Sequence, residues 1–299
     1  MMTAPYTLTI VAAAGTLRGA QLERCLEALA RLATVAGKPD WLAEASACDW
    51  PLAEAPGAEL AIALDSLGID HALHQAGETR RKRVLIADMD STIVQSETLD
   101  EIAGEAGIKD RIAAITARSM AGELDFAEAL IERVAALKGL DEGALSRTLA
   151  RTRVMPGAAE LVGTMRAHGA RCWLVSGGFS YFTGHIAKQL GFHADRSNRL
   201  LIDAGKLTGE VGRPILDRDA KLTALRELCG EVGADLGEAV AVGDGANDLA
   251  MIQAAGMGVA FQAKPAVKKA ARFWVNRADL STLLYYQGYR AADIVTARR

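Results

Sequence analysis

Two carboxylates stand two residues apart in the segment Asp88-Met89-Asp90-Ser91-Thr92, directly after the apolar run 84–87. That run predicts a buried strand, and open α/β sheets bind their ligands just beyond the carboxyl ends of their strands. Carboxylate oxygens in this place suit a hard metal ion and a phosphate group. The pair alone is a weak signal, because aspartates also cap helices and turns.

Phosphate ester hydrolysis gives each of the two carboxylates a task. The phosphoryl oxygens repel an anionic nucleophile, so an enzyme must neutralise their charge, align the attack and protonate the leaving oxygen. Asp88 is our candidate nucleophile, which would form an aspartyl-phosphate. Asp90 is our candidate general acid and base, which would protonate the departing alkoxide and then deprotonate the attacking water.

Three later segments offer the remaining groups. Ser176-Gly177-Gly178 presents a hydroxyl and a free N–H at the start of a predicted helix, which suits a phosphate. Lys221 can offset negative charge as a point cation, although the neighbouring Arg218 could take its place. The loop 243–248 contains glycines that permit a close backbone approach and a further carboxylate, Asp244.

The carboxylates also predict a magnesium site. Mg²⁺ prefers oxygen ligands and keeps several waters, so we predict that Asp88, Asp244 and the backbone carbonyl of Asp90 bind it. Each motif alone has an ordinary structural explanation as a turn, a helix cap or a surface lysine. Their combination, in this order and after successive strands, favours catalysis.

The elements that must position these residues follow a strand–loop–helix pattern from residue 84 onward. The expected strands cover 84–87, 172–175, 239–242, 258–260 and 273–275. The first three end at Asp88, Ser176 and Asp244, which would meet at one sheet edge. We therefore predict an α/β fold with a doubly wound parallel sheet.

A helical insertion is expected between the first two of these strands, at about 96–155. Thr98 with Glu101 reads as a capping box. Further helices are expected from Asp110, from Asp125-Phe126-Ala127-Glu128 and after Asp141. Four short helices would form a lid over the strand ends. Farther on, segments 198–202 and 206–211 flank Asp203-Ala204-Gly205, which predicts a hairpin.

Residues 6–78 predict a small α/β unit without clustered carboxylates or a nucleophile. We expect a strand at 6–12, a helix at 21–33, an extended stretch at 39–52 and a helix at 59–67. For the basic run 80–83 we favour a solvated linker over a phosphate-attracting patch. His71 and His74 would lie on opposite faces of a strand, which favours structural histidines over a metal pair.

Composition excludes several other classes of protein. The chain has 299 residues and a formal net charge of −3, which allows about two domains and argues against a nucleic-acid binder. The apolar run 8–14 is short and lacks a preceding Lys or Arg, so we expect a strand there rather than a signal peptide. No stretch is long enough to span a membrane. Four scattered cysteines predict a reduced, cytoplasmic protein.

The motifs together resemble a known superfamily. Segments 88–92, 176–178 and 243–248, with Lys221 between them, are similar to the four ordered motifs of the haloacid dehalogenase superfamily of phosphatases. Within it the chain is similar to the phosphoserine phosphatase family, over about residues 84–285. The similar segments are 97–103, 175–179, 198–200, 205–209 and 240–249.

The resemblance implies three domains and a reaction. A haloacid dehalogenase-like core would comprise 84–95 and 156–299, with a four-helix cap inserted at 96–155. Residues 1–79 resemble ACT-like regulatory domains. The implied activity is Mg²⁺-dependent hydrolysis of O-phospho-L-serine to L-serine and phosphate through an aspartyl-phosphate, the last step of serine biosynthesis.

The resemblance also implies roles for residues around the substrate. Glu97 would receive the substrate ammonium and Arg133 would clamp its carboxylate, although Arg133 without the resemblance could be a plain surface arginine. Substrate phosphate would contact Ser176, Gly177, Lys221 and Asn247. Met120 and Phe126 would wall the lid side, and Asp248 would support the metal ligands.

Two alternatives stay open from the sequence. The same chemistry could act on another small aminated phosphoester, or transfer the phosphoryl group to another alcohol. A different class would be an amino-acid-sensing protein with an inactive phosphatase core, against which the intact motifs argue. A homodimer and an amino-acid effector bound to the N-terminal domain are further expectations.

Overall fold

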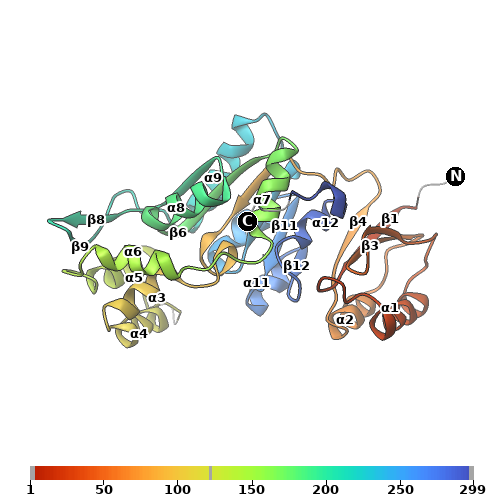
Figure 1. The fold of residues 1–299 in the computed structure, drawn as a ribbon, viewed down its shortest axis with the longest axis horizontal. Coiled ribbons are helices and arrows are strands. Elements are labelled where there is room, and N and C mark those ends of the chain that lie inside the picture. The colour runs from red at the N-terminus through yellow and green to blue at the C-terminus, as the bar shows by residue number, and fades with distance from the viewer. Residues whose placement is uncertain (1–3, 121–122, 296–299) are drawn as a thin grey trace.

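The computed structural model describes residues 4–120 and 123–295 (Figure 1). These residues form a small antiparallel sheet near the N-terminus, a larger parallel sheet and a separate two-stranded hairpin. In the described part of the chain, no helix combines the length and the apolar character that crossing a membrane requires.

The N-terminal segment alternates strand, helix, strand, strand, helix, strand. Its elements are β1 (Tyr6–Val11), α1 (Gly19–Leu32), β2 (Asp40–Ala43), β3 (Ala47–Leu52), α2 (Ala58–Ser66) and β4 (Asp70–Gln75). The strands pair antiparallel in the order β2-β3-β1-β4, a ferredoxin-like arrangement. Leu29 and Leu60 of the two helices pack against Leu8 and Ile10 of β1, so both helices cover the same face. The predicted elements of 6–78 are present, with 39–52 forming two strands.

The larger sheet is parallel, as predicted. Its strands are β5 (Val84–Ala87), β6 (Arg171–Phe179), β7 (Ala194–Asn198), β10 (Ala239–Gly243), β11 (Met257–Phe261) and β12 (Phe273–Val275). They lie in the order β12-β11-β10-β5-β6-β7. The three strands that lead to Asp244, Asp88 and Ser176 are therefore neighbours, with β5 in the centre.

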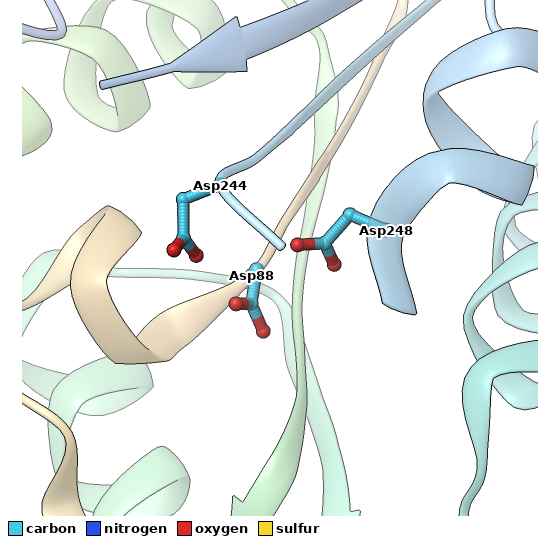
Figure 2. A group of neighbouring side chains, drawn as sticks. All are labelled: Asp88, Asp244 and Asp248. Atoms are coloured by element: carbon cyan, nitrogen blue, oxygen red, sulfur yellow. The ribbon is translucent and has the colours of Figure 1, made fainter. Parts of the chain in front are cut away.

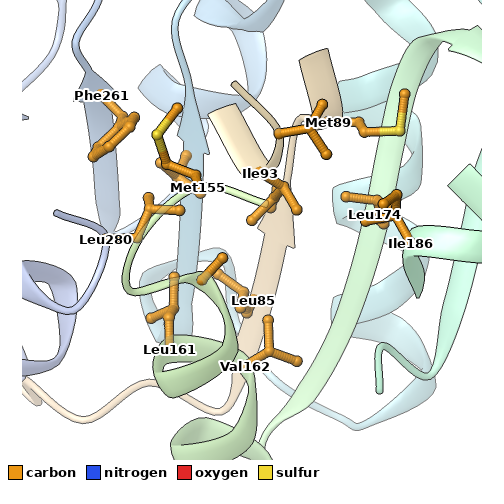
Figure 3. Packing of buried hydrophobic residues seen from close by; sticks show 14 of the residues in the cluster. Leu85, Met89, Ile93, Met155, Leu161, Val162, Leu174, Ile186, Phe261 and Leu280 are labelled. Carbon is orange, nitrogen blue, oxygen red and sulfur yellow. The ribbon is translucent and has the colours of Figure 1, made fainter. Parts of the chain in front are cut away.

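Alternating side chains of β5 face two separate cores, which explains the continuous apolar run. Val84 and Ile86 pack against α9 (Arg218–Glu231). Leu85 and Ala87 share the opposite core with α7 (Ala158–Ala167), where Leu161 and Val162 lie next to Leu85 (Figure 3). The helices on the two faces make the fold doubly wound, as predicted. The other helices around this sheet are α8 (Ser180–Leu190), α10 (Leu249–Ala254), α11 (Pro265–Ala270) and α12 (Thr282–Tyr286).

A helical segment lies between β5 and β6 in the sequence, as expected. It contains four described helices ahead of α7, namely α3 (Thr98–Glu105), α4 (Lys109–Met120), α5 (Phe126–Ala135) and α6 (Gly143–Arg151). The predicted helix start at Asp125 is confirmed, and Asp125 and Glu128 form a capping box at the start of α5. These helices lie beyond the strand ends on one side of the sheet (Figure 1).

The predicted capping box at Thr98 is wrong, although a helix does begin there. Thr98 is the first residue inside α3 and Glu97 is its N-cap, with no side-chain capping bond from Glu97. The Thr98 N–H instead donates to the carboxylate of Asp90, 2.8 Å away. An aspartate of the motif loop thus replaces the local cap, which the spacing of Thr98 and Glu101 could not reveal.

The predicted hairpin is confirmed as β8 (Leu200–Asp203) and β9 (Lys206–Val211). Ala204 and Gly205 both have positive φ, at 46° and 74°, which suits a two-residue turn. The Leu207 carbonyl accepts from Gly139 N, and Leu207 N donates to the Leu140 carbonyl, so the hairpin is fastened to the helical segment. Strand β7 was missing from the prediction, which assigned Asn198 to the hairpin.

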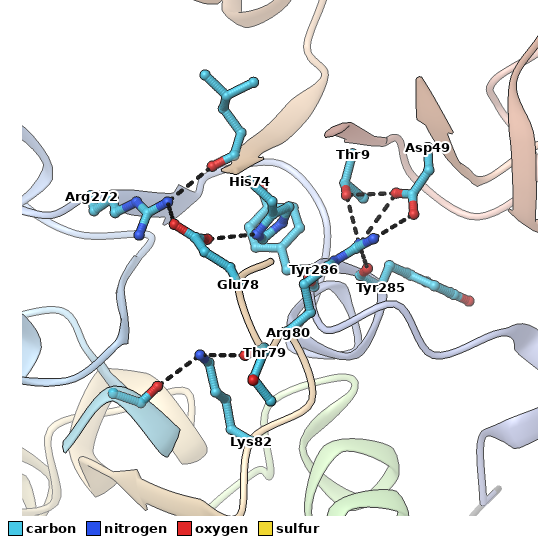
Figure 4. A network of polar contacts seen from close by, with 12 residues as sticks. Thr9, Asp49, His74, Glu78, Thr79, Arg80, Lys82, Arg272, Tyr285 and Tyr286 are labelled. Atoms are coloured by element: carbon cyan, nitrogen blue, oxygen red, sulfur yellow. Dashed lines mark hydrogen bonds and ion pairs between the residues drawn. The ribbon is translucent and has the colours of Figure 1, made fainter. Parts of the chain in front are cut away.

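The basic run 80–83 lies in the connection between β4 and β5, as expected, and Arg81 and Arg83 are exposed, but Arg80 is not solvated. Arg80 binds Asp49 at 2.6 Å and Thr9 at 2.9 Å in the small sheet (Figure 4). It also donates to the backbone carbonyls of Tyr285 and Tyr286 in α12. The other three cations bind protein groups as well: Arg81 binds Asp293, Lys82 the Gly237 carbonyl and Arg83 Glu238. Arg80 therefore fastens the two sheets together, while the other three cations bind the part of the chain around the larger sheet.

The four cysteines and the two histidines of β4 are packed, as expected. All four cysteines are buried thiols without a disulfide. His71 and His74 lie on β4 and contact β12 of the larger sheet, His71 through Trp274 and His74 through Phe273. Among the described residues, the cluster suited to a metal contains neither histidine.

Candidate active site

The three predicted strand ends meet at one edge of the larger sheet. Asp88 follows β5, Asp244 follows β10, and Ser176 lies within β6, the strand on the other side of β5 from β10. The carboxylates of Asp88, Asp244 and Asp248 converge in Figure 2, and one oxygen from each lies within 4.8 Å of the others. The structure thus brings the acidic groups of two distant motifs together.

Lys221 is the central cation of this cluster. Asp217 caps α9 and places Lys221 in its first turn, where the side chain is buried. Its Nζ donates to Asp88 Oδ1 at 2.5 Å and to Asp248 Oδ1 at 2.6 Å. Burial opposes the charged form, but the two carboxylates outweigh it and raise the pKa of Lys221. Lys221 therefore reaches the site as predicted; the side chain of Arg218, its suggested substitute, lies outside the described residues.

The buried Asp88 carboxylate is fixed by this contact. Burial raises its pKa and the charge of Asp248 adds to the effect, while Lys221 opposes both. A cation at the site would favour the ionised, nucleophilic form. Among the described residues, the Asp88 Oδ2 atom has no hydrogen-bond donor and is left available.

Asp248 supports the cluster from inside the loop. Its Oδ1 accepts from Lys221 and its Oδ2 accepts from Gly245 N at 3.0 Å, so both oxygens are already engaged. A side chain on Gly243 would lie 2.4 Å from the Asp248 carboxyl carbon, which explains the glycine. Asp88 and Asp244 therefore retain more capacity for a metal than Asp248 does.

Asp90 is held by donors at both carboxylate oxygens. Thr98 N donates to Oδ1 at 2.8 Å, and Ser176 Oγ donates to Oδ2 at 2.9 Å. Burial raises the pKa of Asp90, while these donors act in the opposite direction. A raised pKa and a fixed orientation both suit a group that gives and takes a proton.

Hydrogen bonds from neighbouring residues hold Ser176 and Gly177 in place near the end of β6. Gly178 N donates to Ser176 Oγ at 2.8 Å, which fixes the hydroxyl beside Asp90. Asn198, buried in β7, donates to the Gly177 carbonyl at 2.9 Å and accepts from Leu216 N at 2.8 Å. Sequence reasoning gave Asn198 no role in the site, since an asparagine before a turn has many ordinary explanations.

Ser91 connects the motif loop to Glu97. Its φ of 55° is left-handed, a strained conformation for serine. Its Oγ donates to Glu97 Oε1 at 2.7 Å, so the strained turn aims the hydroxyl at that carboxylate. Partial burial raises the pKa of Glu97, and the neighbouring charge of Asp90 adds to the effect. A cation at Glu97 would relieve this repulsion.

Arg133 points toward the same acidic region from α5. It is half-buried, and its Nε donates to the Ala129 carbonyl at 3.2 Å. Burial lowers its pKa, whereas the charges of Asp100 and Glu97 raise it. No described carboxylate forms an ion pair with it, so the guanidinium is free to bind an anion.

The remaining predicted contacts lie in different surroundings. Phe126 of α5 reaches Gly177, since a Cβ on that glycine would lie 3.0 Å from the phenyl ring. Asn247 follows Asp244 in the loop, and its side chain forms no hydrogen bond to the described residues. Met120 ends α4, but its side chain lies outside the described residues.

Comparison with known proteins places this site in a family. A family model described as haloacid dehalogenase-like hydrolase matches residues 85–253, which contain all the predicted motifs. The chain belongs to the haloacid dehalogenase-like hydrolase family. The resemblance found in the sequence is thereby confirmed.

Relatives of this haloacid dehalogenase-like chain are named phosphoserine phosphatase. The phosphoserine phosphatase of Streptomyces coelicolor is 43% identical over 239 residues, which are 80% of this chain and 58% of that protein. The chain thus spans little more than half the length of that relative.

Solved structures agree with this placement. A probable phosphoserine phosphatase from Vibrio cholerae, in unliganded form, is 31% identical with a TM-score of 0.81, covering 98% of this chain and 90% of that one. A phosphoserine phosphatase solved as a phospho-aspartyl intermediate analogue is 38% identical with a TM-score of 0.65, covering 69% of this chain and 99% of that one.

Proposed function

We propose that this protein is a Mg²⁺-dependent phosphatase that hydrolyses O-phospho-L-serine to L-serine and phosphate, the last step of serine biosynthesis. The observation that supports this function most directly is that the two carboxylates are held in place by different groups. Lys221 fixes Asp88, while Ser176 and Thr98 fix Asp90 two residues later. The names of its relatives support the choice of substrate.

In the first half-reaction, an Asp88 oxygen attacks phosphorus and the bond between phosphorus and the serine oxygen breaks. Asp90 gives its proton to that departing oxygen, which leaves as the serine hydroxyl. Lys221 and the N–H groups around Ser176 offset the phosphoryl charge. A relative solved as an analogue of the phospho-aspartyl intermediate supports this route.

In the second half-reaction, Asp90 takes a proton from water while the water oxygen attacks phosphorus. The bond to Asp88 breaks, phosphate leaves and the carboxylate is restored. Carboxylates of Asp88 and Asp244, with the Asp90 carbonyl, fit a small hard cation. When bound there, Mg²⁺ would neutralise phosphoryl oxygens and orient them for attack.

The substrate's other two charged groups would bind the helical segment. Glu97 lies among carboxylates and would accept the ammonium, while the unpaired Arg133 would bind the carboxylate in a bidentate manner. Phe126 and Met120 would wall this side, and Asn247 would contact the phosphate. We propose that residues 96–155 act as a cap that closes over the substrate and excludes water.

The same proposal divides the chain into three domains. Residues 84–95 and 156–299 would form the core, and residues 1–79 would form an ACT-like regulatory domain. A cavity of about 580 Å³ between β4, α2 and Trp274 supports an amino-acid effector there. The edge strand β2, with Trp41 37% exposed, supports self-association as a homodimer. Reduced, buried cysteines support a cytoplasmic location.

A phosphate-release screen over small phosphoesters, with and without Mg²⁺, tests the function. We expect turnover of O-phosphoserine that chelation of divalent metal removes and Mg²⁺ restores. Asp88→Asn should lower kcat by about 10³-fold or more, because the nucleophile is lost. Full turnover by Asp88→Asn, or turnover without divalent metal, would overturn the mechanism.

Substitution of Arg133 tests whether phosphoserine is the substrate. Phosphoserine carries a carboxylate and phosphoethanolamine does not. Arg133→Ala should lower kcat/KM for phosphoserine by about 100-fold, the scale of a lost bidentate charge pair, and leave phosphoethanolamine turnover nearly unchanged. An unchanged kcat/KM for phosphoserine would refute the assignment, while leaving the phosphatase chemistry intact.

A further inference from the structure

Thr98 carries a buried hydroxyl that the proposed mechanism does not use. The residue is 1% exposed, and its Oγ1 forms no hydrogen bond of regular geometry with the residues that the structure describes, although it lies near enough to the Asp90 carboxylate to lower the pKa of that group. Its backbone N–H is already taken by Asp90 Oδ1. An unsatisfied buried hydroxyl lowers the stability of a folded protein, so its presence calls for a compensating role.

The hydroxyl lies where catalytic groups converge. A Cβ built on Gly178 would lie 2.8 Å from Asp90 Oδ2, 3.0 Å from Ser176 Oγ and 3.5 Å from Thr98 Oγ1. These three oxygens therefore surround one point beside the glycine backbone. Ser176 Oγ has partners on both sides, since it donates to Asp90 and accepts from Gly178 N. The Thr98 hydroxyl alone among the three forms no regular hydrogen bond to the described residues.

A second buried threonine shows how the location of Thr98 differs from that of an ordinary buried threonine. Thr282 is likewise the first residue of its helix, α12, is fully buried and has an Oγ1 without a partner in the described chain. Its helix packs on α7 and β1, away from the motif loop that carries Asp90. Thr98 combines the same unsatisfied hydroxyl with the carboxylate that moves the proton.

We propose that the Thr98 hydroxyl is a further substrate-contacting group, whose partner arrives with the reactants. It donates a hydrogen bond to the oxygen that exchanges a proton with Asp90. That oxygen is the serine ester oxygen in the first half-reaction and the attacking water in the second. No bond to Thr98 forms or breaks; Asp90 supplies and recovers the proton. The inference rests on the proposed phosphatase function.

Thr98→Val is the deciding variant because valine keeps the shape and the backbone N–H and removes only the hydroxyl. We expect kcat/KM for phosphoserine to fall about 10- to 100-fold, with an unchanged or higher thermal midpoint. Thr98→Ser keeps a hydroxyl and should stay within about threefold of wild type. Thr282→Val, the matched control, should retain full activity with the same trend in thermal midpoint.

A change of leaving group distinguishes the loss of a hydrogen bond to the substrate from a general disturbance of the site. An aryl phosphate releases an acidic phenol that needs little protonation, so Thr98→Val should lower its kcat/KM much less than that for phosphoserine. Equal losses on both esters, or wild-type kcat/KM on phosphoserine, would overturn the role of Thr98. Failure of the wild-type protein to hydrolyse any phosphoester would instead overturn the proposed function itself.

Discussion

At the scale of single residues, the site depends on where side chains are absent. Gly178 does not have a positive φ angle, so backbone conformation does not explain why a glycine stands at this position. It is explained by space, because a Cβ there would lie 2.8 Å from Asp90 Oδ2. Gly243 has the same relation to Asp248. Two glycines of the motifs thus make room for neighbouring carboxylates, one from another motif and one from the same loop.

Gly178→Ala should therefore impair turnover more than folding. The added methyl would displace the Asp90 carboxylate from its donors, and we expect kcat/KM to fall about 100-fold, within the range of acid–base contributions. Gly184→Ala is the matched control, since no atom lies within 4 Å of the new methyl in α8. It should keep full activity and stabilise the helix by up to about 1 kcal/mol. Full activity of Gly178→Ala would contradict the spatial argument.

At the scale of elements, strand β4 forms the contact between the two sheets through its histidines. His74 stacks on Phe273 of β12 and is 2% exposed. Burial lowers the pKa of His74 from 6.5 to about 3, and Arg80, Arg272 and Lys82 add to the shift. The imidazole is therefore neutral in the folded protein at physiological pH.

This burial predicts a pH dependence of stability. Below pH 6.5 the unfolded chain protonates His74, whereas the folded protein does so only near pH 3. Stability should therefore fall as pH decreases through that window, by about 1.4 kcal/mol per pH unit for this one group. Urea unfolding of wild type and His74→Gln across the window measures the difference. Identical slopes for the two proteins would show that His74 protonates in the folded state.

The elements near the motifs were largely predictable from the sequence, and those set by distant contacts were not. The run 84–87 predicts its strand because both faces are buried and every position is apolar. Strand β7 was missed because Ala194–Asn198 is half-exposed and mostly polar, so no periodicity marks it. The start of α3 depends on Asp90, which a local capping pattern cannot include. Asn198 and Thr98 contact residues that only the fold brings close to them, so the local sequence does not indicate their roles.

At the scale of the whole molecule, Arg80 connects the two sheets. Its side chain is 20% exposed, and its donors reach Asp49, Thr9 and two carbonyls of α12. A partly buried guanidinium with several partners stabilises far more than an exposed ion pair. The neighbouring Arg81, 49% exposed, has only such a pair with Asp293.

Arg80→Ala should destabilise the protein by about 2–4 kcal/mol, because Asp49 loses its ion pair and the Tyr286 carbonyl loses its donor. Arg81→Ala should cost less than about 1 kcal/mol. Chemical denaturation measures both, and limited proteolysis within 76–83 should be faster only in Arg80→Ala. Equal stability of the two variants would show that Arg80 does not hold the sheets together.

The Arg80 contacts also bear on the order in which the protein assembles during synthesis. The partners Thr9 and Asp49 are made early, but the Tyr286 carbonyl belongs to a residue 206 positions after Arg80. The small sheet can fold by local pairing as it leaves the ribosome, yet its docking surface on β12 and α12 does not exist until that later stretch has been translated. Docking of the N-terminal segment is thus a final step, and an early stop in translation before α12 would leave it tethered but unattached.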